Sequence, residues 1–218
     1  HGYLFALGLY LSTIYWIAFG VSVYIEQFWW AIPFALFGLP AFMALFYGVL
    51  AAFVWHFRAS KLFHFIFCIT WLYVEWLISW IFTGLPWSLL GYSFSVSDIL
   101  IQASSVFGIL GLSFAAVYIG SSLYSKNMLP VRIIISLSII IAIICYGIQR
   151  LDENPTELSE VKVRIVQPSI PQIAKWDQGI FWQNLDQQVE MSNQEGDPDI
   201  IVWSEAALTA PYYYKPVY

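Results

Sequence analysis

The sequence predicts a multi-span α-helical membrane bundle followed by the start of a water-soluble α/β domain. Hydrophobic residues make up 60% of the chain and charged residues only 11%, whereas soluble domains carry about 25% charged residues. The charge is also unevenly divided. Residues 1–150 hold five Lys/Arg and three Asp/Glu, while residues 151–218 hold four Lys/Arg and eleven Asp/Glu. No basic patch is available to neutralise phosphates, so nucleic acid is not an expected partner.

Five apolar segments reach the roughly 20 residues that a membrane-spanning helix needs. They lie at residues 2–25, 28–55, 62–82, 99–123 and 131–149. Arg58 and Lys61 lie between the second and third segments. Lys126 and Arg132 flank the link between the fourth and fifth. Basic links stay in the cytoplasm, so we expect the chain to start there and to continue outside after the fifth span.

Residues 83–98 differ from the spans on either side of them. Gly84 and Pro86 break the third helix as it reaches the outer face. The sequence nevertheless stays apolar until Asp98. We therefore expect an arm along the outer membrane surface, suited to contact a lipid or a lipidated substrate.

Two residues near this arm stand out. Glu75 lies inside the third span, and an acid in that position indicates either a functional site or a structural hydrogen bond to a neighbouring helix. Trp87 lies near a predicted interface, where membrane proteins commonly place an aromatic belt.

Residues 150–160 are polar and predict a linker to the domain at 161–218. Residues 161–165 alternate apolar and charged side chains, as in a strand with one exposed face. From Asp177 to Glu195 the pattern is helical, with Asp177 as a candidate N-cap. The apolar face of this helix is predicted to comprise Phe181, Leu185 and Val189.

A second strand, residues 200–203, is entirely apolar and is predicted to be buried on both faces. The order strand, helix, strand favours parallel neighbours. Glu205 follows this strand, and the carboxyl ends of strands in α/β folds face the ligand crevice. Glu205 is therefore a candidate catalytic acid or base. The 58 residues from 161 onward are too few for a closed, layered sheet, and His1 begins in apolar sequence, so we expect a chain truncated at both ends.

Four segments in this order resemble the apolipoprotein N-acyltransferase family. They are residues 28–40, 75–87, 166–177 and 200–205, the last reading Ile-Ile-Val-Trp-Ser-Glu. The resemblance implies an enzyme of the bacterial inner membrane, in which a membrane bundle carries a periplasmic nitrilase-like (carbon–nitrogen hydrolase) domain. Two departures are present: Ile78-Ser79 stands where the family often has Arg-Gly, which weakens an ionic role for Glu75, and Ser204 replaces a usual proline.

The resemblance implies acyl transfer from a membrane phospholipid to the N-terminal amino group of a diacylglyceryl-cysteine lipoprotein, through a thioacyl-enzyme. Glu205 matches the general base of a Glu-Lys-Cys set. The matching Lys and Cys are expected beyond Tyr218, because Lys215 follows Glu205 too soon. Trp176, Glu75 and Trp87 are candidates for shaping the site or binding substrate, although Trp176 could equally pack its own loop. No metal or cofactor is expected, and the isolated chain is expected to be inactive.

Two other functions remain open on the sequence alone. A non-enzymatic membrane subunit or transporter would use Glu75 in a conduction or coupling path and Glu205 structurally, but no internal repeat is visible. A membrane-anchored nitrilase-type amidase would need fewer than five spans.

Overall fold

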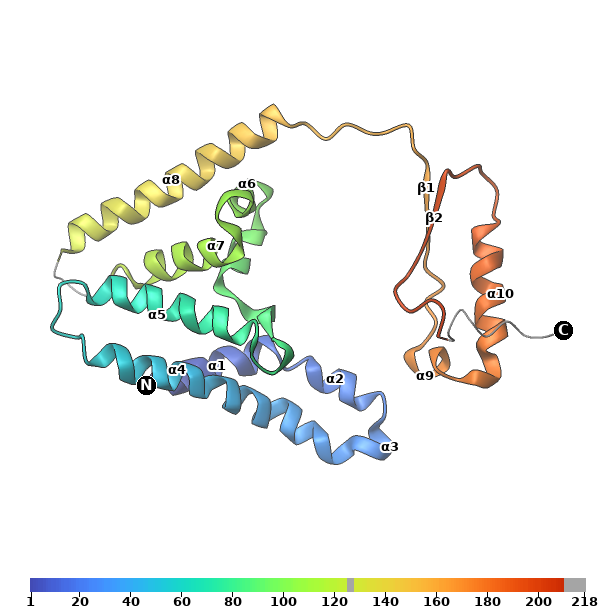
Figure 1. Cartoon of the computed structure of the whole chain (residues 1–218), viewed down its shortest axis with the longest axis horizontal. Helices are drawn as coiled ribbons and strands as arrows, with labels where there is room; N and C mark the ends of the chain where they lie inside the picture. The colour runs from blue at the N-terminus through green and yellow to red at the C-terminus, as the bar shows by residue number, and fades with distance from the viewer. Residues whose placement is uncertain (125–127, 210–218) are drawn as a thin grey trace. The chain divides into compact units, whose positions relative to one another are not determined.

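The structure is a computed structural model that describes residues 1–124 and 128–209 (Figure 1). The chain divides into two compact units, His1–Pro155 and Thr156–Tyr218. The first unit is helical, and the second combines helices with a two-stranded parallel sheet. Lys126 and Lys215, which enter the sequence analysis, lie outside the described residues.

The first unit contains eight α-helices among the described residues. They are α1 (Gly2–Thr13), α2 (Ile17–Ser22), α3 (Ile25–Phe28), α4 (Leu39–Trp55), α5 (Phe63–Ile78), α6 (Asp98–Ile101), α7 (Ser104–Ser121) and α8 (Leu129–Glu153). Three helical stretches of the described chain are long and apolar enough to cross a membrane, namely Ile25–Trp55, Ser104–Ser121 and Leu129–Glu153. α1 and α5 are apolar but have only 12 and 16 residues.

The first predicted span, residues 2–25, is wrong as a single helix. α1 ends at Thr13, and α2 and α3 follow as short separate helices. The hydroxyls of Ser12 and Thr13 both donate to the Leu9 carbonyl, at 2.8 and 2.9 Å. Such bonds compete with the helical backbone and bend helices. The fourth predicted span, residues 99–123, is likewise interrupted, between α6 and α7.

The start of the predicted linker also shifts. α8 continues to Glu153, so the first residues of the segment 150–160 are helical. The side chain of Asn154 donates to the Arg150 carbonyl at 2.9 Å, as does its backbone N–H at 3.0 Å. These two bonds satisfy a carbonyl that the end of a helix otherwise leaves free.

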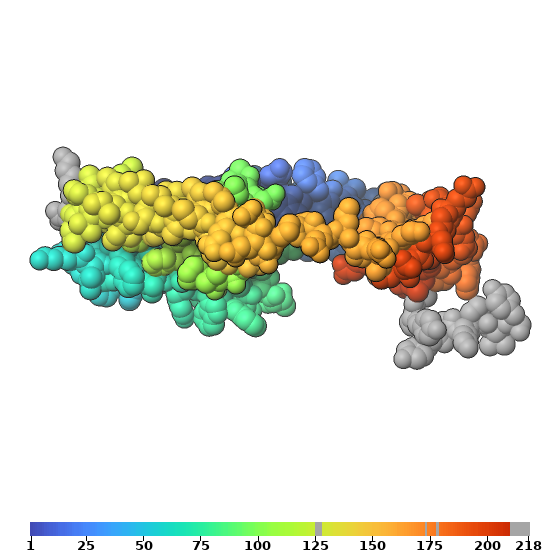
Figure 2. Space-filling model, turned by 90° about the horizontal axis from the view of Figure 1, so that it is seen from above, coloured from blue at the N-terminus to red at the C-terminus, as the bar shows by residue number. Residues whose placement is uncertain are grey.

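The core of the first unit lies where α1, α4, α5 and α7 meet. Ala6 of α1 and Ala44 of α4 are fully buried, and the small side chains let these two helices approach closely. Large apolar side chains remain exposed on the outside, including Phe19, Val49 and Ile134. Figure 2 shows α8 at the surface of this unit. An apolar outer surface is expected of helices that face lipid.

Between α5 and α6 the chain leaves regular helix. Phe82, Thr83 and Gly84 have consecutive positive φ angles of 52°, 75° and 84°. Two short 3₁₀ segments follow, Pro86–Ser88 and Leu90–Val96. α5 ends at Ile78, four residues before the predicted end of the span at residue 82 and ahead of Gly84 and Pro86, so the break at these two residues is wrong in position.

Gly91 is expected to allow the segment Leu90–Val96 to pack closely against α7. Its N–H donates to Ser113 Oγ at 2.8 Å, and a Cβ at this position would collide with the Ile109 carbonyl and lie 2.9 Å from Ser113 N. We expect Gly91→Ala to lower the free energy of unfolding by about 1–3 kcal/mol, the usual cost of overpacking. Thermal unfolding in detergent measures this change. Gly8→Ala is the control, since a Cβ there meets nothing within 4 Å, and equal melting of the two variants would contradict the prediction.

The second unit contains β1 (Val163–Val166), α9 (Gln172–Lys175), α10 (Phe181–Ser192) and β2 (Ile200–Trp203). β1 and β2 pair in parallel, with Val163 opposite Ile200 and Val166 opposite Trp203. The predicted parallel pair is confirmed. Asp177 caps the short turn Gln178–Ile180 ahead of α10, because its Oδ1 accepts from Gly179 N at 2.8 Å.

Two details of this unit contradict the prediction. β2 is not buried on both faces, since Ile200, Ile201 and Val202 are 49%, 46% and 44% exposed. The described residues supply only one neighbouring strand and one long helix, and α10 packs against β1. The inward face of α10 also differs, because Gln188 is buried while Val189 is exposed.

Candidate active site

The carboxyl ends of β1 and β2 lie at the same edge of the sheet because the strands are parallel. Ser169 lies in the loop after β1, and Glu205 and Ala206 lie in the turn after β2. Ser169 and Ala206 have positive φ angles of 55° and 53°, a conformation that costs a non-glycine residue about 1–3 kcal/mol. Strain of this kind concentrates at functional sites, so this edge is the candidate site of the second unit.

Glu205 is held through its backbone and leaves its side chain available. The Lys175 Nζ donates to the Glu205 carbonyl at 2.9 Å, and the Ala207 N–H donates to the Ser204 carbonyl at 3.1 Å. The Glu205 side chain is exposed, and its carboxylate accepts no hydrogen bond from residues 1–124 or 128–209. A carboxylate presented in this way can accept a proton from a substrate or a nucleophile.

Trp176 follows Lys175 directly and is half exposed. Its segment is attached to α10, because Asn184 Nδ2 donates to the Ala174 carbonyl at 3.0 Å. Lys175 therefore links the turn that carries Glu205 to the segment that carries Trp176.

One face of α10 carries three polar side chains spaced four residues apart, Asn184, Gln188 and Ser192. Asn184 holds the Trp176 segment, as described above. Gln188 Nε2 donates to the Ala207 carbonyl at 3.1 Å, and Ser192 Oγ accepts from Trp203 Nε1 at 2.9 Å. α10 thus fixes β2 and the turn that follows it through side-chain hydrogen bonds.

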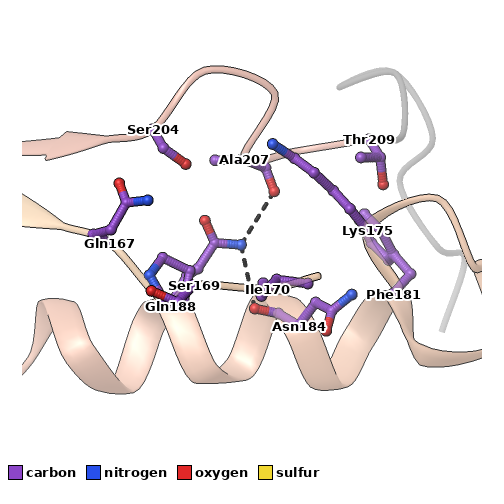
Figure 3. A pocket seen from close by; sticks show the side chains of 11 residues that line it. Gln167, Ser169, Ile170, Lys175, Phe181, Asn184, Gln188, Ser204, Ala207 and Thr209 are labelled. Atoms are coloured by element: carbon purple, nitrogen blue, oxygen red, sulfur yellow. Dashed lines mark hydrogen bonds between the residues drawn. The ribbon is translucent and has the colours of Figure 1, made fainter. Parts of the chain in front are cut away.

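A cavity of about 70 Å³ lies at this edge (Figure 3). Its walls include Gln167 and Ser169 after β1, Ser204 after β2, and Lys175. Gln188 is 1% exposed, and its Oε1 has no hydrogen-bond partner among the described residues. Figure 3 shows its Nε2 bonded to the Ala207 and Asn184 carbonyls. The cavity has room for about two water molecules or a small polar group, which could donate to Oε1.

In the first unit, Glu75 connects α5 to the irregular segment after it. Glu75 is 1% exposed, and its Oε1 accepts from Trp71 Nε1 at 2.9 Å and from Leu90 N at 3.0 Å. Oε2 has no hydrogen-bond partner within the described ranges. Of the two roles that the sequence left open, the structure shows the hydrogen bond that holds a neighbouring segment.

Trp87 belongs to the same segment and is 61% exposed. Its ring lies 4.8 Å from that of Trp16, between centroids. Ser88 Oγ donates to Thr13 Oγ1 at 2.9 Å beside this pair. The two tryptophans therefore form an exposed aromatic pair where the segment meets the end of α1.

Residues 1–122 match the apolipoprotein N-acyltransferase N-terminal domain. The chain belongs to the apolipoprotein N-acyltransferase family. A protein of that name from Rickettsia bellii is 50% identical over 216 residues, which cover 97% of this chain and 43% of the relative. Those of Rickettsia typhi and Brucella melitensis biotype 1 are 50% and 35% identical, over 96% and 97% of this chain and 43% and 42% of the relatives. The chain thus spans less than half the length of these relatives.

Sequence reasoning named Glu205 and Trp176 as candidates but did not find Lys175, which bonds the Glu205 carbonyl, or Gln188, which bonds the carbonyl of Ala207 in the same turn. The four-residue spacing from Asn184 to Ser192 carried the signal for α10, because residues at i and i+4 share a helix face. The sequence analysis instead used the apolar residues of this helix, Phe181, Leu185 and Val189, to predict its inward face.

Replacing Gln188 by leucine is expected to loosen the turn around Glu205. The Ala207 carbonyl would lose its donor, which costs about 1–2 kcal/mol and corresponds to about 5–30-fold faster opening. Hydrogen exchange of the amides in residues 204–208 measures the effect. Gln187→Leu, on the exposed face of α10, is the control. Exchange rates that match between the two variants would contradict a role for Gln188 in holding this turn.

Proposed function

We propose that the chain carries the lipid-facing bundle and the general base of an enzyme that N-acylates lipoproteins. The acyl donor is a membrane phospholipid, and the acceptor is the α-amino group of a diacylglyceryl-cysteine lipoprotein. The observation that carries this proposal is the Glu205 carboxylate, exposed at the carboxyl edge of a parallel strand pair in a chain of this family. The curated relatives bear the name apolipoprotein N-acyltransferase.

In the proposed reaction Glu205 moves one proton in each half. It first takes the proton of a cysteine thiol, and the thiolate attacks the ester carbonyl of the phospholipid. The ester C–O bond breaks, and the lysophospholipid alkoxide leaves with the proton from Glu205. The lipoprotein amine then attacks the thioester, Glu205 accepts the amine proton, and the thiolate leaves and regains it.

The remaining groups of this proposal come from the family resemblance. The cysteine and the lysine that steadies the oxyanion are expected outside the described residues, in the rest of a nitrilase-like domain. Trp176 shapes the site beside Glu205. In the first unit, residues 83–98 with Trp87 contact lipid or the lipid chains of the acceptor, and Glu75 holds that segment in place.

The proposed orientation places the first residue in the cytoplasm and the second unit in the periplasm. Arg58 and Lys61 lie in the link before α5. Lys126 lies in the sequence between α7 and α8, and Arg132 lies in the first turn of α8. Both basic links lie on one side of the membrane only if α5 crosses it as well as α7. A 16-residue helix is short for this purpose, and its flanking segments must complete the crossing.

A chimaera tests the proposal. This chain would replace the matching 43% of the Rickettsia bellii relative, in a bacterium depleted of its own N-acyltransferase. We expect mass spectrometry to detect triacylated lipoproteins with the chimaera. The 218-residue chain alone serves as the negative control. A chimaera that inserts normally and leaves lipoproteins diacylated, while the intact relative acylates them, would refute the proposal.

A further inference from the structure

The first unit contains a cavity of about 640 Å³ far from the segment that Glu75 holds. Its walls come from the start of α1, from the ends of α4, α5 and α7, and from the residues directly after α7. They include Val54, Phe63, Phe67 and Leu123. Cavities of about 300–1,000 Å³ with mostly apolar walls accommodate organic ligands. Phe63 begins α5 and Ile78 ends it, so the cavity and residues 83–98 lie at opposite ends of a helix about 24 Å long.

A polar pair interrupts the apolar wall. His64 Nδ1 lies 3.5 Å from Ser121 Oγ, and that hydroxyl donates to the Val117 carbonyl. Ser121 therefore accepts from Nδ1–H, which leaves His64 Nε2 to accept from a ligand hydroxyl or, in the protonated ring, to donate to an anion. Nε2 is buried and has no partner within the part of the chain that the structure describes. A buried polar atom of this kind favours a ligand that completes its hydrogen bonding.

Positive charge lies beside Trp55, one of the residues that line the cavity. The Arg58 guanidinium lies 4.7 Å from the centre of the Trp55 ring, and its Nη1 donates to the Trp55 carbonyl at 3.2 Å. Lys61 is exposed in the same link between α4 and α5. Basic groups beside a pocket between membrane helices attract anionic lipid headgroups.

We propose that this cavity binds an anionic phospholipid. One acyl chain lies against Val54, Phe67 and Leu123, and the phosphate lies near Arg58 and Lys61. A headgroup hydroxyl or phosphate oxygen pairs with His64 Nε2. The lipid is separate from the acyl donor of the proposed reaction, because residues 83–98 lie at the other end of α5.

Native mass spectrometry of the 218-residue chain in detergent, with added phosphatidylglycerol or phosphatidylcholine, tests this proposal. We expect at least tenfold preference for phosphatidylglycerol. Gly120→Phe should reduce retention about tenfold, since Gly120 lines the cavity and a Cβ there meets nothing within 4 Å. Gly8→Phe is the matched control, because Gly8 is equally unobstructed and does not line the cavity. Equal retention of the two lipids, or equal retention by both variants, would overturn the proposal.

A charge variant keeps the test valid if Gly120→Phe does not fold. Arg58→Gln with Lys61→Gln should abolish the preference for phosphatidylglycerol while helix content by circular dichroism stays unchanged. Lys162→Gln in the second unit is its control. A photo-crosslinker in place of Leu123 then identifies the occupant in the chimaera. Crosslinks to lipid support the proposal, and crosslinks to a protein segment overturn it.

Discussion

Replacing Glu205 by glutamine in the chimaera is expected to lower the rate of acyl transfer by about 10²–10⁴-fold, the usual contribution of a general base. Glutamine has nearly the same shape but cannot take a proton from the thiol or the amine. The turn should persist, because its hydrogen bonds use the Glu205 carbonyl and the Ser204 carbonyl rather than the carboxylate. The measurement is the initial rate of N-acylation of a diacylated lipopeptide in membranes that contain equal amounts of each protein.

Glu190→Gln provides the control for this experiment, since Glu190 is an exposed carboxylate on α10 in the same unit. It should leave the rate unchanged. Trapping of the acylated enzyme with labelled phospholipid adds a second readout, because Glu205→Gln should slow formation of the thioester. Near-normal rates of both half-reactions in Glu205→Gln would exclude this carboxylate as the base. They would leave membership of the family untouched.

Glu75→Leu is expected to destabilise the first unit strongly. It leaves the buried Trp71 Nε1–H and the partly buried Leu90 N–H without their acceptor, at about 1–3 kcal/mol for each donor. We expect a loss of about 2–6 kcal/mol in the free energy of unfolding. Thermal unfolding in detergent measures the loss, and hydrogen exchange of the Leu90 amide reports whether the segment after α5 detaches first.

Two controls separate the hydrogen bonds of Glu75 from its charge. Glu75→Gln keeps an oxygen that can accept from both donors, so most of the stability should return. Glu26→Leu removes an exposed acid of the same unit and should change stability by less than about 0.5 kcal/mol. If Glu75→Gln were as unstable as Glu75→Leu, the ionised carboxylate itself would be required for stability.

Patterns that depend on one stretch of sequence led to correct predictions. The apolar run of residues 200–203 and the alternating run near β1 predicted a parallel pair, because a helix separates them. The same reasoning placed Glu205 directly after β2. Burial of β2 was not predictable in this way, since it depends on which layers cover the strand. Ile201 is an apolar, β-branched residue of the kind found in fully covered strands, yet it is 46% exposed.

Side-chain hydrogen bonds account for most of the other differences. Hydropathy treats Ser12 and Thr13 as minor interruptions of an apolar run, yet their bonds to the Leu9 carbonyl lie where α1 ends. By hydropathy Gln188 is similarly a surface residue, although its side-chain amide donates a hydrogen bond to the Ala207 carbonyl in the turn after β2. The partners of these side chains become visible only when the backbone is placed.

The attachment of residues 86–96 has a consequence for biogenesis. Two backbone amides of this segment find their acceptors elsewhere, Leu90 on Glu75 and Gly91 on Ser113, which lies 22 residues further along the chain. During translation the segment is therefore synthesised after its first acceptor, Glu75, and before its second, Ser113. In lipid, unpaired amides are costly, so the segment cannot settle on the bundle until α7 has entered the membrane. The segment is synthesised before α7, but the hydrogen bond of Gly91 can form only after α7 is present.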